Sequence, residues 1–238
     1  MYLPNLTHDL YPLSSPEKAR TYAWFFKTGK GQYGYGDRFI GCTVPEMRKV
    51  AKKYVSMSFA DLKKLLKNKI HEYRFMALEI LVMKYEKADV KEKKKIVRFY
   101  LKNKKMINNW DLVDTSAPYI LGDWLVANEK ESSLLYKLAG SESLWDRRIA
   151  IASTYTFIRT GRFDHTLKIA LILLNDKQDL IHKAVGWMLR EVGNKSEQIL
   201  IDFLDESWQK MPRTMLRYAV ERLGTKRAKY FPKKNNMV

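Results

Sequence analysis

The sequence predicts an all-α protein, folded as a curved solenoid of two-helix repeats. Two observations predict this class. Glycine and proline are sparse, at 11 and 7 residues, and no clear strand alternation is found. From residue 45 onward, apolar residues recur instead at three- and four-residue spacings, which is typical of helices that each bury one face.

The helical pattern is clearest in four segments. They are FADLKKLLKNK (59–69), YRFMALEILVMKYEK (73–87), VKEKKKIVRFYLKN (90–103) and HTLKIALILLND (165–176). Helix-breaking residues are expected to separate the helices at Asn108–Asn109, Gly140–Ser141, Gly161, Asn175–Asp176 and Gly193–Asn194. Each segment is therefore predicted to form a helix of ordinary length.

An aromatic, helix-like segment, TYAWFFKT, precedes the first glycine-rich stretch of the chain. That stretch, GKGQYG (29–34), matches the dinucleotide pattern G-x-G-x-x-G, but the pattern requires a strand before it and a helix after it. The sequence predicts a loop between the first two helices here. Trp24, Phe25 and Phe26 in the aromatic segment are predicted to lie mostly in the core, and one of the three could still face the groove.

The predicted helices alternate in character. One helix of each pair is plainly amphipathic, and the next carries charged residues or tryptophan near its start. These second helices begin near His71, Asn109, Trp145, Ile181 and Pro212. The starts are roughly 30–40 residues apart, which is the repeat length of two-helix solenoids such as HEAT proteins.

Corresponding helices of such repeats line one concave surface. Basic residues recur at this position in the repeats, namely Arg74, Arg147, Arg148, Lys183, Arg190, Arg213 and Arg217. A basic groove of this kind would fit a nucleic-acid duplex. For any single arginine, a solvated repeat surface is the alternative.

No domain boundary is evident inside residues 15–225, so a single domain over 1–238 is expected. The last stretch, TKRAKYFPKKNNMV, is basic and aperiodic, and it is expected to form a frayed tail from about residue 226.

The sequence contains no apolar run long enough to span a membrane and no secretory signal at its start. Cys42 is the only cysteine, which excludes an internal disulfide and favours a reducing, cytoplasmic location. Four scattered histidines and one cysteine make a metal site unexpected, and no cofactor is predicted. A chain of this kind is expected to act as a monomer.

The chain is strongly basic. Lys and Arg number 44 against 26 Asp and Glu, giving a formal net charge of +18 and a pI near 9.8. This balance favours a nucleic-acid partner. Acidic lipid or an acidic protein are the alternative partners.

The stretch NNWDLVDTSAPYILGDWL (108–125) contains the most distinctive chemistry. Trp110 and Asp114 are four residues apart, which places both side chains on one helical face. Trp187 has Arg190 three residues later, and Gly186 before it permits another surface to approach closely. Arg148 lies in LWDRRIAIA with Arg147 beside it. An Asp114–Arg148 structural ion pair is the alternative interpretation of these charges.

This set of residues suits the removal of a damaged base. A purine alkylated at N3 or N7 is cationic and is already a good leaving group, so the reaction needs no strong general acid. It needs a carboxylate near the sugar to stabilise positive charge and orient water, which Asp114 would supply. Indoles beside the sugar would exclude water and attract cationic character. Arginines would hold the flanking phosphates.

WDLVD, APYILGDWL, LWDRRIAI, KAVGWMLREVG and MPRTMLRYAVERL, in this order, resemble the DNA alkylation repair family, the AlkD-type HEAT-like repeat DNA glycosylases. YAWFFKTGKGQYGYGDRFIGCTVPEMRKVAKKY resembles the N-terminal part of these proteins. The resemblance covers roughly residues 15–230. It implies a curved helical solenoid that wraps duplex DNA, and metal-free excision of cationic N3- and N7-alkylpurines without a deep base pocket.

The resemblance also implies roles for individual residues. The catalytic aspartate falls on Asp114, and the sugar-contacting tryptophans fall on Trp110 and Trp187. A phosphate-contacting arginine falls on Arg148, and Arg190 matches a neighbouring family arginine. Where the family can have a groove-facing tyrosine, this chain has Phe25, which lacks the hydroxyl. Candidate DNA contacts are Arg148, Arg190, Arg147, Lys183, Arg74 and Phe25.

Three functions therefore remain open at the level of sequence. The first is a monofunctional alkylpurine DNA glycosylase of base excision repair, acting on duplex DNA. The second is a noncatalytic HEAT-like module that binds duplex or branched nucleic acid. The third is a protein-interaction scaffold. The carboxylate of Asp114 favours the enzyme, and the basic charge disfavours the scaffold.

Overall fold

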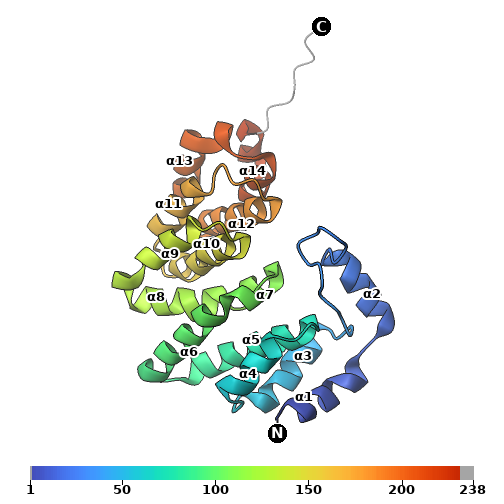
Figure 1. Cartoon of the computed structure of the whole chain (residues 1–238). Coiled ribbons are helices and arrows are strands. Elements are labelled where there is room, and N and C mark those ends of the chain that lie inside the picture. Colours follow the sequence, from blue (N-terminus) through green and yellow to red (C-terminus); the bar gives the residue numbers. More distant parts are fainter. Residues whose placement is uncertain (1, 231–238) are drawn as a thin grey trace. The chain divides into compact units, whose positions relative to one another are not determined.

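A computed structural model describes residues 2–230, and these residues form helices joined mostly by short turns, with one long connection over residues 26–43 (Figure 1). The predicted all-α class is confirmed. Within this range the extended pairing is limited to one isolated parallel bridge between Arg38 and Ile70. The α-helices are α1 (Tyr2–Leu10), α2 (Pro16–Phe25), α3 (Val44–Ala51), α4 (Phe59–Leu66), α5 (His71–Lys87), α6 (Val90–Asn103), α7 (Trp110–Asp114), α8 (Asp123–Ala127), α9 (Ser133–Ala139), α10 (Leu144–Arg159), α11 (Asp164–Ile172), α12 (Asp179–Lys195), α13 (Glu197–Ser207) and α14 (Arg213–Ala219).

Local sequence explains where several helices begin. Thr43 and Glu46 form a capping box at the start of α3, in which each side chain bonds the backbone of the other. Asp89 at the start of α6 accepts from the amide of Glu92 at 2.8 Å. Each cap satisfies a backbone donor that has no partner within its own helix.

The chain divides into two compact units, Met1–Trp124 and Leu125–Val238. The division falls inside α8, so the backbone crosses it as helix rather than as a linker. The single domain expected from the sequence stays a prediction, as does the curvature of the solenoid.

In the first unit, α5 is the central helix. It contacts α3, α4, α6 and α7, and most of its residues are buried. A helix that is surrounded in this way has little exposed polar face, and α5 buries four charged or titratable side chains as well, His71, Glu72, Arg74 and Glu79. Buried polar groups require partners, and the partners of these four position the candidate site.

In the second unit, α10, α12 and α14 pack in sequence, α10 against α12 and α12 against α14. Around them, α9 and α11 pack against α10, and α11 and α13 pack against α12. This is the predicted alternation of two-helix repeats. The predicted starts near His71, Asn109, Trp145, Ile181 and Pro212 all lie within two residues of the starts of α5, α7, α10, α12 and α14.

Four of the five predicted breaks are confirmed, and the one predicted at Gly193–Asn194 lies two residues before the actual break at Ser196. Both residues lie inside α12, which continues to Lys195. A Cβ added to Gly193 would lie 2.4 Å from Cδ2 of Leu200. Gly193 therefore serves the close packing of α13 against α12 rather than ending the helix.

The C-terminal segment also differs from its prediction. Residues Gly224–Tyr230 form a 3-10 helix instead of a frayed tail. Tyr230 is buried and donates its hydroxyl to Asp205 at 2.9 Å, while Lys229 pairs with the same carboxylate at 2.7 Å. The remainder of the predicted basic tail, residues 231–238, lies outside the described residues.

Candidate functional site

Trp110 and Asp114 lie at the two ends of α7, a helix of only five residues. Asn109 caps this helix, and its side chain accepts from the amide of Trp110 at 2.8 Å. Both Trp110 and Asp114 are half-buried, whereas Leu112 and Val113 between them are fully buried. The helix thus turns its apolar residues inward and leaves the indole and the carboxylate partly accessible.

Polar side-chain contacts join α7 to α5 near both ends of α7. In its first turn, Oδ2 of Asp111 lies 2.7 Å from Nε2 of His71. Just after its end, the hydroxyl of Thr115 donates to Oε1 of Glu79 at 2.6 Å. Glu79 also accepts from Arg48 of α3 at 3.1 Å. Asp114 is therefore bracketed by two polar contacts to the central helix of the unit.

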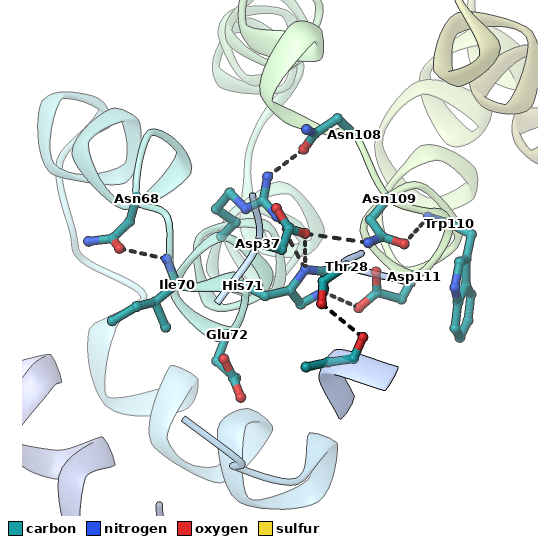
Figure 2. Close-up of polar contacts among 12 residues, drawn as sticks. Thr28, Asp37, Asn68, Ile70, His71, Glu72, Asn108, Asn109, Trp110 and Asp111 are labelled. Carbon is teal, nitrogen blue, oxygen red and sulfur yellow. Dashed lines mark hydrogen bonds and ion pairs between the residues drawn. The ribbon is translucent and has the colours of Figure 1, made fainter. Parts of the chain in front are cut away.

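His71 lies between two carboxylates (Figure 2). Its Nδ1 lies 3.0 Å from Oδ2 of Asp37, opposite the contact of Nε2 with Asp111. Burial alone would lower the pKa of His71, but the charge of Asp111 and the hydrogen bonds to Asp111 and Asp37 raise it to about 9. The imidazole is therefore protonated at neutral pH.

The same oxygen of Asp37, Oδ2, accepts further hydrogen bonds. Arg74 reaches it at 2.5 Å and Asn109 at 3.5 Å. Arg74 also donates to the side chain of Asn108. Burial alone would raise the pKa of Asp37, but the hydrogen bond from His71 and the charge of Arg74 hold it below its ordinary value. This cluster joins the loop before α3, the start of α5 and the start of α7.

Aromatic rings cover the cluster on one side. Phe26 stacks on Trp110 with ring centroids 5.3 Å apart and an interplanar angle of 8°. Phe26 and Phe39 also lie over the His71 ring, at 5.0 and 4.8 Å. Phe25 meets Trp110 edge-on at 6.0 Å. One face of the Trp110 indole is thus occupied by the protein itself.

The expectation that Trp24, Phe25 and Phe26 lie mostly in the core is wrong for two of them. Trp24 is 72% exposed and Phe25 is 51% exposed, while Phe26 is half-buried. A pocket of about 400 Å³ is lined by these three side chains and mainly by other apolar side chains of α2, α3 and the loop between them. Phe25 therefore remains available for a contact with DNA.

The other predicted site residues lie in the second unit. Trp187 is half-buried on α12, where its indole N–H donates to Glu191 at 3.2 Å and its ring lies 6.0 Å from Tyr155. The close approach predicted at Gly186 is confirmed, because an added Cβ would lie 2.5 Å from both the Met215 carbonyl oxygen and Cβ of Tyr218. The joining of Trp187 with Trp110 and Asp114 in one site stays a prediction.

Two of the predicted DNA contacts have their donors turned inward. Arg74 is 5% exposed, and its guanidinium is held by Asp37 and Asn108 inside the first unit, so its contact with DNA stays a prediction. Arg147 pairs with Asp176 at 2.5 Å and donates to the carbonyls of Ser141 and Glu142. It joins two loops instead of offering a free guanidinium.

The remaining basic residues differ in accessibility. Arg148 is 5% exposed and donates to the carbonyl of Leu180 at 2.5 Å. Arg190 pairs with Glu221, and Lys183 pairs with Asp179 at 2.8 Å. Arg190 and Lys183 keep partly exposed side chains, so they remain candidates for phosphate contacts. The predicted contact of Arg148 with a phosphate also stays a prediction.

Sequence reasoning missed the residues that hold α7 in place. His71, Asp37 and Asp111 bear charge or can bear it, and all three are largely buried, at 3%, 9% and 14% side-chain exposure. The sequence does contain a signal for Asp111, because this residue lies inside WDLVD between Trp110 and Asp114. The contact of Asp37 with His71 spans 34 residues and has no local signature.

Within residues 2–230, no group of three or more His, Cys, Asp or Glu side chains is arranged to hold a metal ion. Of the helices described, none combines the length and apolar character needed to cross a membrane.

The comparisons with known proteins show the family and the fold. A family model described as DNA alkylation repair enzyme matches residues 6–223. A solved structure, a predicted DNA alkylation repair enzyme from Enterococcus faecalis, superposes with a TM-score of 0.70 at 18% identity, covering 89% of this chain and 97% of that one. No curated protein matches the sequence significantly. The structural likeness shows the shared fold. Because the family model matches nearly its whole length, the chain belongs to the DNA alkylation repair enzyme family.

Proposed function

We propose that this protein is a monofunctional DNA glycosylase of base excision repair. Its substrates would be cationic N3- and N7-alkylated purines in duplex DNA, and the reaction would be hydrolysis of the N-glycosidic bond without a metal or cofactor. The protein would act as a monomer in the cytoplasm. Family membership supports a role in alkylation repair, and the geometry around α7 supports the specific reaction.

Asp114 would carry the chemistry. Loss of a cationic base leaves positive charge on the deoxyribose, and a fixed carboxylate stabilises that charge and orients the attacking water. Trp110 and Trp187 would line the sugar and exclude bulk water. Arg148, Arg190 and Lys183 would bind the flanking phosphates.

One observation supports the catalytic assignment more than any other. α7 anchors Asp111 in the interior through His71, but it leaves Asp114 and Trp110 half-buried at the spacing of one helical turn. A carboxylate beside an indole on an immobilised helix is preorganised for a developing cation. A carboxylate on a DNA-binding face repels phosphate unless it has a structural or a catalytic role.

The deciding experiment is release of free base from duplex DNA that contains N7-methylguanine, with and without a metal chelator. We expect release of the methylated base in both conditions, with the DNA backbone left intact. Release that stops with the chelator would contradict the metal-free reaction. Strand cleavage that accompanies release would contradict the monofunctional one.

The alternative is a noncatalytic protein that binds duplex or branched nucleic acid. The net charge of +18 supports it, because charge alone accounts for DNA binding without a catalytic group. Such a protein would bind DNA with an affinity that falls steeply with salt, yet release no base. A third possibility, a protein scaffold, predicts an affinity for DNA that is weak at all salt concentrations.

A further inference from the structure

A helix as short as α7 does not hold its own orientation. With five residues it forms little more than one turn, and isolated helices much shorter than about 12 residues are marginal in water. Contacts with neighbouring elements must therefore set the direction in which Trp110 and Asp114 point.

The two carboxylate contacts of the His71 ring together require a protonated histidine. Both ring nitrogens of His71 face carboxylate oxygens, at 3.0 Å for Asp37 and 2.7 Å for Asp111. Both nitrogens can donate only when the ring is an imidazolium. Phe26 and Phe39 cover the faces of the ring, and the His71 side chain is 3% exposed, so bulk water has little access to it.

The charged groups around His71 come from three elements. Asp37 lies in the loop before α3, and Asp111 lies on α7. Arg74 and Glu72 lie on α5 itself, and Nη2 of Arg74 is 3.2 Å from Nδ1 of His71. Oδ1 of Asp111 is buried without a hydrogen bond, so the bond to His71 is the polar contact that holds this carboxylate.

The contact at the end of α7 is independent of His71. Thr115 donates to Glu79, which lies about two turns further along α5 than His71. The two contacts together lay α7 against one rigid helix. Only the contact at the start involves a histidine, the side chain whose charge changes between neutral and alkaline pH.

We infer that His71 is a positioning residue: through Asp111 it sets the orientation of α7, and thereby the placement of Trp110 and Asp114 for base excision. The effect on base excision rests on the proposed function. The orientation of α7 by His71 does not depend on that function. His71 does not touch the substrate. It acts through the helix.

The test uses His71→Gln in the full chain, because glutamine cannot donate to two opposed carboxylates at once. Tyr54→Phe is the matched control, since it removes a hydrogen bond to Asp9 elsewhere in the same unit. Three quantities are compared: the single-turnover rate of base release per folded molecule, the affinity for undamaged duplex, and hydrogen exchange of the peptide spanning residues 108–116.

We expect the rate of His71→Gln to fall at least tenfold, with affinity for undamaged duplex unchanged within twofold and with faster exchange in residues 108–116. Tyr54→Phe should change none of these. The wild-type rate should also fall relative to that of His71→Gln as pH rises through about 9, where the imidazolium is lost.

The inference would be overturned if His71→Gln released base as fast as the wild type, measured per folded molecule. Unchanged hydrogen exchange in residues 108–116 would overturn it as well. Equal changes in Tyr54→Phe would overturn it too, because they would indicate general loosening of the unit. If wild-type protein releases no base, the proposed function fails, and the exchange measurement still decides whether His71 positions α7.

Discussion

The guanidinium of Arg190 on α12 lies against the carboxylate of Glu221, which follows α14. The side chain of Glu221 is 55% exposed, so the pair lies at the surface. Exposed ion pairs contribute only about 0–1 kcal/mol, because water and salt screen them. A DNA phosphate could therefore take the place of Glu221, at the cost of breaking a weak bond.

Neutralising Glu221 should accordingly strengthen DNA binding. We expect Glu221→Gln to raise the affinity for undamaged duplex by about two- to fivefold, since the competing carboxylate is gone. Glu206→Gln, an exposed change of equal charge on α13, is the control for net charge. Titration of both variants with a labelled duplex at one fixed salt concentration is the measurement. Equal gains in the two variants would show that Arg190 has no special part in binding.

Removing the charge of Asp114 should separate catalysis from binding. We expect Asp114→Asn to lower the single-turnover rate of base release by about a hundredfold or more, in line with the loss of a preorganised charge-stabilising group. Affinity for undamaged duplex should stay the same or rise slightly, because a carboxylate no longer repels phosphate. Asp202→Asn, at an exposed position on α13, is the control. Normal release by Asp114→Asn would remove this residue from the mechanism.

The fold was largely accessible from sequence because helical periodicity is a local signal. The starts of α5, α7, α10, α12 and α14 follow from apolar spacing and from charged residues at fixed offsets. The same signal misplaces the break at Gly193, because the role of this glycine depends on Leu200, which packs against it from the next helix. A glycine that ends a helix and one that admits a neighbour look identical in a single sequence.

The candidate site was accessible only in part. Trp110 and Asp114 share one short helix, so their spacing is enough to place them together. Arg74 looked like a groove residue, but its partner Asp37 is 37 residues away and draws the guanidinium inward. Long-range pairing of buried charges leaves no periodic trace, and for this reason the contact between His71 and Asp111 was not foreseen.

Gly186 should be sensitive to the smallest possible addition. We expect Gly186→Ala to lower the free energy of unfolding by about 1–3 kcal/mol, because its Cβ would overlap the backbone of Met215 and the side chain of Tyr218. Gly140→Ala is the matched control, since the nearest atom to its Cβ is 3.6 Å away. Chemical denaturation of both variants is the measurement. Similar stability for the two variants would show that α14 can shift away from α12 without cost.

The pKa of His71 also makes the stability of the protein depend on pH. Its folded pKa of about 9 lies above the value of 6.5 for an unfolded chain, so the folded state binds this proton more tightly. The resulting stabilisation is fully present below about pH 6.5 and is lost as pH rises through about 9. At 1.36 kcal/mol per unit, it is on the order of 3 kcal/mol.

Urea denaturation at pH 6.5 and at pH 10 measures this loss. Wild-type protein should lose more free energy of unfolding between the two pH values than His71→Gln, which has no proton to release at this position. Other groups titrate over the same range in both proteins, so the difference between the two losses isolates His71. An equal loss in both would show that the imidazole carries no charge between Asp37 and Asp111 at neutral pH, contrary to the two carboxylate contacts of its ring.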